Sequence, residues 1–383
     1  MEKFRIDEIT INLDNLRKPL NSQQRKEMSK KKLYPYYGAN NLMDYIDEYI
    51  FDEEILCVAE DGGSWGYKEK CSYIVNEKCW VNNHAHILKA KKNINLKYLM
   101  YYLNYNDLSN RITGTTRGKL TKSALNSIEV KLPSIEKQKK IVALLEKAQE
   151  LIDKRKKQIE ELDLLVKSKF IEMFGDPVIN PKGWKYPKIE EVVANKKNAI
   201  KAGPFGSALK KEYYIKSGYK IYGQEQVISG DINLGDYYIS EEKYKELENY
   251  AIKSNDVLIS LVGTYGKLLI VPTIFEAGII NPRLMKITFN SNLINTIYFK
   301  FFFQSESLRN RLSDNTHGGT MPILNVGIVR NINIPIPPIE LQNQFADFVK
   351  QVDKLKFKME KSLKELEENF NSLMQKIFKV DLL

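Results

Sequence analysis

The residues best suited to chemistry lie in short glycine-bearing segments that combine amide, basic and aromatic side chains. In residues 202–211, glycine lets the backbone approach a phosphate, Ser207 offers a hydroxyl, and Lys210 and Lys211 offer positive charge. Asn and Gln side chains can pair with both polar atoms of an adenine edge, and Arg can do the same with guanine. The composition of these segments therefore favours a surface that binds nucleic acid.

A single segment of this kind is more often a plain turn, so the prediction depends on its recurrence at similar places in both halves of the chain. In the first half the predicted DNA-binding residues are Tyr37, Asn40, Asn41, Ser64, Trp65, Lys68, Asn82, His84, Thr115, Arg117 and Lys119. In the second half they are Phe205, Ser207, Lys210, Lys211, Gln224, Gln226, Thr264, Tyr265, Lys267, Asn281, Arg283, His317 and Thr320.

Patterns for cofactor chemistry are missing from the sequence. It has no G-x-x-x-x-G-K-[ST] phosphate loop and no G-x-G-x-x-G nucleotide turn, so we expect neither ATP nor a dinucleotide to bind. Asn281-Pro-Arg-Leu has Arg where the box of an adenine methyltransferase needs a second Pro. We therefore expect no cofactor and no catalytic residue.

Two weaker patterns carry alternatives. Asp231, Glu241 and Lys243 match the residue types of an Asp…Glu-x-Lys nuclease motif. A motif with such variable spacing recurs by chance, and this one has no counterpart in the first half. A second pattern could form a zinc site; its residues are Cys71, Cys79, His84 and His86. The Cys-x₇-Cys spacing does not suit a zinc knuckle, and the second half lacks all four ligands. We therefore expect no metal.

Length and composition limit the class of protein. The 383 residues suggest two or three domains, and a hydrophobic content of 43% is enough to bury a core, which excludes general disorder. The formal net charge of +11 favours a polyanionic partner. The apolar runs are too short to span a bilayer, the first residues carry acids, and three cysteines cannot close a disulfide set; together these features favour the cytoplasm.

The chain repeats itself with a period near 200 residues. Gly114–Leu120 and Pro133-Ser-Ile-Glu-Lys-Gln138 resemble segments that begin at Gly318 and Pro337, and Pro133 and Pro337 lie 204 residues apart. Upstream the offset drifts, since Asn82 lies 199 residues before Asn281. This pattern predicts two similar domains related by approximate two-fold symmetry.

Each half ends in a segment with apolar residues at spacings of three and four over about five heptads. The first segment, residues 136–174, would form a helix roughly 58 Å long at ~1.5 Å per residue. Because so long an apolar stripe must meet another, we predict that the two helices pair antiparallel and separate the globular halves. The alternatives are that both helices pack into ordinary cores or dimerise with another chain.

The predicted fold class is α+β, with globular halves at residues 1–133 and 176–337 and helices at 134–175 and 338–383. Within the halves, alternating apolar runs predict strands at residues 54–59, 256–262 and 286–289. Helices are predicted at matching places in the two halves, at residues 95–105 and 294–303.

The sequence resembles the specificity subunits of type I restriction–modification systems. The resemblance rests on the tandem architecture, on Pro133–Gln138 and its repeat at Pro337, and on Gly203-Pro-Phe-Gly-Ser-Ala-Leu209. The first half departs from the family pattern because it lacks a Gly-Pro-Phe-Gly loop and has Gln24-Arg-Lys-Glu-Met-Ser-Lys-Lys-Lys32 in that region.

The resemblance implies a non-catalytic subunit with two target recognition domains, each reading one half of a split, asymmetric site in double-stranded DNA, while the helices fix the gap. Two modification subunits, which bind S-adenosylmethionine and methylate adenine, would dock on this chain. Restriction subunits would add ATP-driven translocation and magnesium-dependent cleavage. Two other interpretations stay open: a coiled-coil scaffolding protein of another complex, and a self-sufficient DNA enzyme that uses the Asp231 trio.

Overall fold

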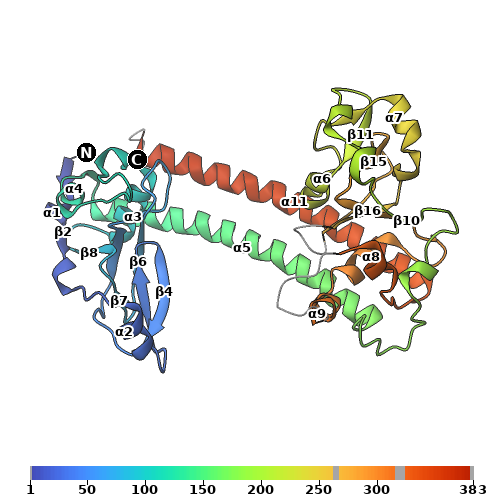
Figure 1. The fold of residues 1–383 in the computed structure, drawn as a ribbon. Coiled ribbons are helices and arrows are strands. Elements are labelled where there is room, and N and C mark those ends of the chain that lie inside the picture. Colours follow the sequence, from blue (N-terminus) through green and yellow to red (C-terminus); the bar gives the residue numbers. More distant parts are fainter. Residues whose placement is uncertain (1, 262–266, 315–323, 380–383) are drawn as a thin grey trace. The chain divides into compact units, whose positions relative to one another are not determined.

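The computed structural model describes residues 2–261, 267–314 and 324–379. By its own contacts the chain divides into two compact units. Unit 1 comprises Met1–Lys156 and Lys361–Leu383, and unit 2 comprises Lys157–Glu360. Each unit therefore contains one globular half and part of each of two long helices, α5 (Ile135–Phe174) and α11 (Ile339–Phe378), which are drawn in green and red in Figure 1.

Unit 1 is built on two main sheets. The antiparallel sheet has the order β2-β8-β5-β6, and the mixed sheet has the order β4-β3-β7. Its strands are β1 (Glu2–Arg5), β2 (Thr10–Asn12), β3 (Tyr34–Gly38), β4 (Asn41–Ile46), β5 (Ile55–Ala59), β6 (Ser72–Val75), β7 (Trp80–Val81), β8 (Ala85–Ala90) and β9 (Glu129–Leu132). Its shorter helices are α1 (Ile6–Ile9), α2 (Ser22–Glu27), α3 (Leu96–Tyr105) and α4 (Lys122–Asn126).

Unit 2 repeats this plan. Its antiparallel sheet has the order β10-β16-β13-β14 and its mixed sheet the order β12-β11-β15. The strands are β10 (Ile200–Ala202), β11 (Tyr219–Tyr222), β12 (Tyr238–Ile239), β13 (Val257–Ser260), β14 (Leu268–Ile270), β15 (Gly278–Ile280) and β16 (Leu284–Ile287). The shorter helices are α6 (Gln224–Ser229), α7 (Glu241–Glu246), α8 (Thr296–Phe303), α9 (Glu306–Asp314) and α10 (Val326–Arg330).

The predicted helices are confirmed as α3 and α8, and the predicted strands as β5, β13 and β16. The strand β16 lies two residues earlier than predicted, and Val262, the last residue predicted for the strand at β13, lies outside the described residues. The strand β5 forms because a run of five apolar residues is buried on both faces. The helices α3 and α8 begin after matching asparagines: the side chain of Asn95 accepts a hydrogen bond from the Tyr98 N–H, and that of Asn295 accepts one from the Ile297 N–H. The fold class is α+β as predicted.

The repeated motif at Pro133 and Pro337 is explained by a buried glutamine. Gln138 is fully buried; its Oε1 accepts the Asn95 N–H at 2.9 Å, and its Nε2 donates to the carbonyl oxygens of Asn93 and Pro133 at 3.0 and 2.8 Å. Gln342 makes the same three bonds in unit 2, with Asn295, Leu293 and Pro337. Each glutamine thus fastens the start of a long helix to the start of α3 or α8.

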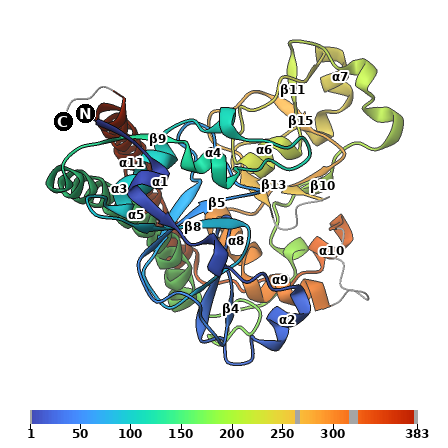
Figure 2. The ribbon, with the colours of Figure 1, turned by 90° about the vertical axis from the view of Figure 1, so that its left-hand side faces the viewer.

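The predicted antiparallel pairing of α5 and α11 is confirmed inside each unit. In unit 1, Lys156 forms an ion pair with Glu367 at 2.8 Å, and Leu145, further back on α5, shares a core with Phe378, further forward on α11. Figure 2 shows α3 beside this pair, where the Phe378 ring lies 5.6 Å from the ring of Tyr98.

Unit 2 shows the same antiparallel order. Lys356 forms an ion pair with Asp163 at 2.7 Å, and the rings of Phe170 and Phe345 lie 5.5 Å apart. As the residue number rises along α5, the partner's number falls along α11. Among the described residues, no helix is both long and apolar enough to cross a membrane.

Part of the predicted apolar stripe does not enter this seam. Leu144, Leu151 and Leu165 of α5 are 46%, 48% and 48% exposed. A pair of helices buries only one narrow face of each partner, and Leu144 and Leu151, seven residues apart, lie on another. These leucines belong to the apolar spacing of α5 but remain partly exposed outside the contact between the two helices.

Candidate nucleic-acid interface

Four of the predicted interface loops, two in each unit, follow a pair of parallel strands. In unit 1, β3 and β7 run parallel, with Tyr37 opposite Val81. In unit 2, β11 and β15 run parallel, with Tyr222 opposite Ile280. Because parallel strands end at the same edge of a sheet, the two loops that follow each pair are brought side by side, a common position for ligand sites.

In unit 1 this arrangement holds Asn82 beneath the loops. Its backbone N–H donates to the Tyr37 carbonyl at 3.0 Å, and its side-chain Oδ1 accepts the His84 N–H at 2.8 Å. Asn82 is only 3% exposed, so its amide shapes the turn. The half-buried imidazole of His84 is the predicted group that this turn presents.

Unit 2 contains the same construction. The Asn281 N–H donates to the Tyr222 carbonyl at 2.8 Å, and the Asn281 Oδ1 accepts the Arg283 N–H at 2.9 Å. Glycine at position 223 leaves room for this amide, because a Cβ added there would lie 2.8 Å from the Asn281 Nδ2. The repeat in the sequence aligned Asn82 with Asn281. Arg283 is therefore the structural counterpart of His84.

Four loops of unit 1 meet around one carboxylate, Asp61. His84 Nδ1 lies 2.9 Å from Asp61 Oδ2, and Arg117 Nη2 lies 2.6 Å from Asp61 Oδ1. Asn40 Nδ2 donates to the carbonyl of Gly62 at 3.1 Å. Three predicted residues from separate loops are therefore gathered in one place. Asp61 itself was not predicted, although it opens the loop that contains Ser64 and Trp65.

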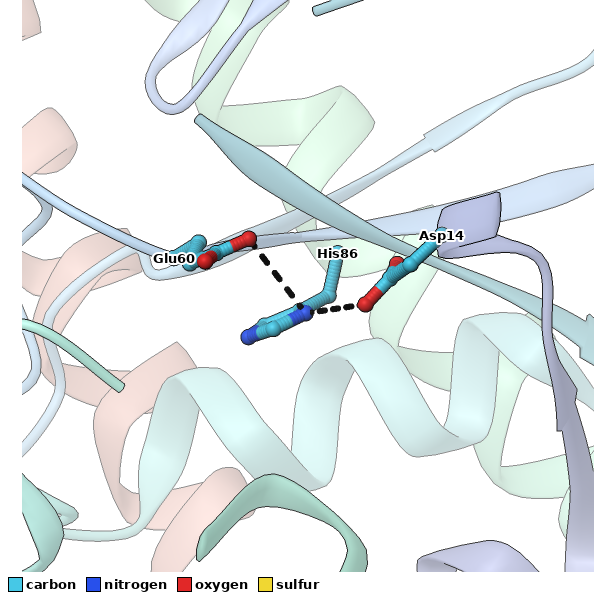
Figure 3. Close-up of side chains that lie close together, drawn as sticks. All are labelled: Asp14, Glu60 and His86. Carbon is cyan, nitrogen blue, oxygen red and sulfur yellow. Dashed lines mark hydrogen bonds and ion pairs between the residues drawn. The ribbon is translucent and has the colours of Figure 1, made fainter. Parts of the chain in front are cut away.

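Beneath these loops lies a buried charged network that the sequence did not reveal (Figure 3). His86 is 1% exposed; its Nδ1 lies 2.6 Å from Asp14 Oδ2 and its Nε2 lies 2.8 Å from the carbonyl oxygen of Leu120. Burial alone would raise the pKa of the Asp14 carboxyl, but the hydrogen bonds from His86 and from the Ile87 N–H hold that pKa below its ordinary value.

Arg17 joins this network to the loops. Its Nη1 lies 2.5 Å from Glu60 Oε2 and 2.8 Å from the carbonyl oxygen of Ala85, which follows His84. Lys119 Nζ lies 3.0 Å from the other oxygen of Glu60. Burial alone would raise the pKa of Glu60, but Arg17 and Lys119 hold it below its ordinary value. The network therefore ties together the loops that carry Asp61, His84 and Lys119.

Asp14, Glu60 and His86 offer donor atoms that would suit a metal ion, all within 4.8 Å of one another. Arg17 already supplies positive charge to both carboxylates, since its guanidinium lies 3.6 Å from Asp14 as well as beside Glu60. The imagined zinc set is also dispersed: Cys71 and Cys79 lie in different hydrophobic clusters.

Several predicted residues are buried and support the loops. Tyr37 is 9% exposed and its hydroxyl donates to Glu77 Oε1 at 2.8 Å; burial and this carboxylate raise its pKa. Trp65 is 7% exposed and its Nε1–H donates to the carbonyl of Ala59 at 3.2 Å. Both residues contribute to core packing, which explains their aromatic character without a DNA contact.

Other predicted residues are exposed. Those in unit 1 are Asn41, Ser64 and Thr115, and those in unit 2 are Ser207, Lys210, Lys267 and Phe205, of which Phe205 is 68% exposed. Lys68 is exposed but lies apart from the Asp61 cluster, since its N–H donates to the carbonyl of Tyr105 at the end of α3. Thr264, Tyr265, His317 and Thr320 lie outside the described residues.

In unit 2 the strand ends open onto a pocket of about 720 Å³. Four predicted residues line it: Lys211, Gln224, Asn281 and Arg283. Tyr214, Tyr237 and Glu225 also line it and were not predicted. Gln226 does not line it; it is fully buried, and its Oε1 accepts the Gly223 N–H at 2.7 Å. The two glutamines of one short segment therefore have different positions and different roles.

The Asp231, Glu241 and Lys243 trio has no common site. Lys243 Nζ lies 2.8 Å from Glu246, Glu241 lies 2.8 Å from Lys245, and the Asp231 carboxylate accepts the backbone N–H two residues further on. Glu241 and Lys243 form ion pairs on α7, whereas Asp231 lies in the turn after α6, so the arrangement gives no support to a nuclease centre.

This architecture matches that of a known protein family. A model described as the type I restriction modification DNA specificity domain matches residues 1–163 and 181–368. The chain belongs to this family. The two matched stretches cover both globular halves and most of both long helices.

Individual members of the family are distant relatives. A putative type I restriction enzyme specificity subunit of Haemophilus influenzae is 27% identical over 368 residues, covering 91% of this chain and 87% of that protein. The MjaVIII specificity subunit of Methanocaldococcus jannaschii is 25% identical, covering 84% and 80%. The crystal structure of a type I restriction-modification system S subunit from M. genitalium shares the fold, with a TM-score of 0.57 at 14% identity over 98% of this chain and 96% of that one.

Proposed function

We propose that this chain is the DNA sequence-specificity subunit of a type I restriction–modification complex and that it binds a bipartite, asymmetric site in double-stranded DNA. The observation that carries the proposal is the repeated construction in which Asn82 presents His84 and Asn281 presents Arg283. One scaffold holds two different side chains at equivalent positions, which is what reading two different half-sites requires.

We assign residues 1–133 and 176–337 as the two target recognition domains and residues 134–175 and 338–383 as the spacer helices that set the gap between half-sites. In the first domain, the groups offered to DNA are Asn40, His84, Arg117 and Lys119. In the second domain they are Lys211, Gln224 and Arg283, which share one pocket. Lysines supply charge for phosphates, whereas the amides and Arg283 can pair with base edges.

In this proposal the chain is not itself catalytic. Two modification subunits would bring S-adenosylmethionine and methylate adenine, and restriction subunits would bring ATP and magnesium for translocation and cleavage. The exposed Leu144 and Leu151 on α5 support docking of a protein partner, because exposed leucines at heptad spacing favour contact with another helix.

Methylation-site mapping tests the proposal. Cells that contain the complete complex should carry methylated adenines in one bipartite sequence, and cells that lack only this chain should lose that methylation. Complementation with His84→Ala and with Arg283→Ala should each relax a different half-site. Methylation that persists without this chain would refute the proposal.

A further inference from the structure

The pocket of unit 2 contains one carboxylate among basic and polar groups. Glu225, the second residue of α6, lines it together with Lys211 and Arg283. A carboxylate repels the phosphates that the lysine and arginine attract. A glutamate is therefore out of place in a surface that only follows the DNA backbone.

The structure holds this carboxylate in a defined place. The buried Gln226 donates from Nε2 to Glu225 Oε1 at 3.3 Å and to the carbonyl of Leu234 at 2.6 Å. Gly235 has a φ of +79°, and a Cβ added to it would lie 2.4 Å from Glu225 Oε1. The surrounding backbone therefore leaves room for the carboxylate, and the amide of Gln226 anchors it.

An ionised carboxylate only accepts hydrogen bonds, and its two oxygens offer about four lone-pair sites. The contact with Gln226 uses one of them. In the DNA major groove the group that suits such an acceptor is an exocyclic amino group, and the pairing typical of Glu is with cytosine N4.

We propose that Glu225 is a specificity-determining residue that reads the exocyclic amino group of a cytosine in the half-site of the second domain. The proposal rests on the proposed DNA-reading function and deepens it. Arg283, which lines the same pocket, carries the complementary preference for guanine. Gln226 acts as a positioning residue, because it holds Glu225 without lining the pocket itself.

The proposal can be tested because removing the Glu225 carboxylate has different effects if it reads a base and if it only repels DNA. Loss of a repelling charge strengthens binding to every sequence and changes the salt dependence. Loss of a base-reading acceptor weakens binding to one class of sequence and leaves the others unchanged.

The experiment uses the full chain assembled with its modification subunits and a randomised duplex library, with bound sequences counted at two salt concentrations. The variants are Glu225→Ala, the isosteric Glu225→Gln, and Glu242→Gln, which makes the same change of charge on an exposed residue of α7 that does not line the pocket. The parent complex establishes whether two half-sites are read at all.

For Glu225→Ala we expect a loss of roughly 5- to 150-fold in preference at one cytosine position of one half-site, the range of a single good base contact. Glu225→Gln should shift that position toward adenine, and Glu242→Gln should change nothing. An equal gain in affinity for all sequences, or an unchanged preference in both Glu225 variants, would overturn the proposal while the DNA-reading function stands. A parent complex without sequence preference would overturn the function itself.

Discussion

Replacing Gln342 by Leu should destabilise unit 2 while leaving unit 1 intact. The change keeps the side-chain volume but removes three hydrogen bonds from a fully buried position. At about 1 kcal/mol net for each bond, the expected loss is about 3 kcal/mol. The partners left behind belong to the backbone at the start of α8 and at the start of α11, so the effect should be greatest there.

Amide hydrogen exchange on the full chain can localise this loss. A cost of about 3 kcal/mol corresponds to roughly 100-fold faster exchange for amides of α8 that open with the unit. Peptides that cover α3 in unit 1 should exchange as in the parent chain. Gln138→Leu is the matched control and should give the reverse pattern, because Gln138 makes the same three bonds in unit 1.

Two results would refute this reasoning. If both variants accelerated exchange equally in both units, the glutamines would act on one cooperative structure and not on separate units. If Gln342→Leu changed exchange in α8 by less than about fivefold, the three bonds would contribute less than about 1 kcal/mol in total and could not explain the repeated motif.

Three further outcomes follow from the interface. His84→Ala and Arg283→Ala should each cost roughly 1–3 kcal/mol of discrimination in different half-sites, which sequencing of bound DNA would detect as loss at separate positions. Binding of the assembled complex to duplex DNA should weaken steeply with salt, and a flat response in titrations between low and physiological salt would contradict phosphate contacts by lysine. The lowered pKa values of Asp14 and Glu60 contribute stability that is present above their ordinary values near 4 and is lost as the pH falls through the lower folded values. Urea unfolding measured from pH 6 to pH 3 should therefore show acid destabilisation of unit 1 that Asp14→Asn makes shallower, and an equal slope in that variant would contradict the assignment.

The scaffold was more predictable than the interface because its signals are periodic or repeated. The spacing of three and four predicted the long helices, and the matching places of residues 95–105 and 294–303 in the two halves predicted α3 and α8. The same pattern could not show which apolar residues face the partner helix, so it did not distinguish the exposed Leu144 and Leu151 from the buried Leu145 and Ile152. Periodicity reports an apolar face, but the width of the contact depends on the partner's shape.

The interface depends on contacts that sequence spacing does not reveal. His86 meets Asp14 across 72 residues, and the half-buried Arg17 completes the network. Gln224 and Gln226 are two residues apart on α6 and so project in different directions, one lining the pocket and one entering the core. From composition alone, both glutamines were predicted to bind DNA, because only the packing of α6 distinguishes them.

The two units show how one framework can present different side chains at equivalent positions. In both units the asparagine after a parallel strand bonds to the neighbouring strand end through its N–H and fixes the following turn through its Oδ1. Neither bond involves the side chain presented two residues later, which is His84 in one unit and Arg283 in the other. The presented side chain can therefore change without loss of the bonds that position it. What differs is the support behind it: Asp61 fixes the His84 imidazole in unit 1, whereas in unit 2 Arg283 shares an open pocket with Glu225. The base preference of each half should accordingly be set by the presented residue together with its neighbouring carboxylate, and less by the shared strands beneath.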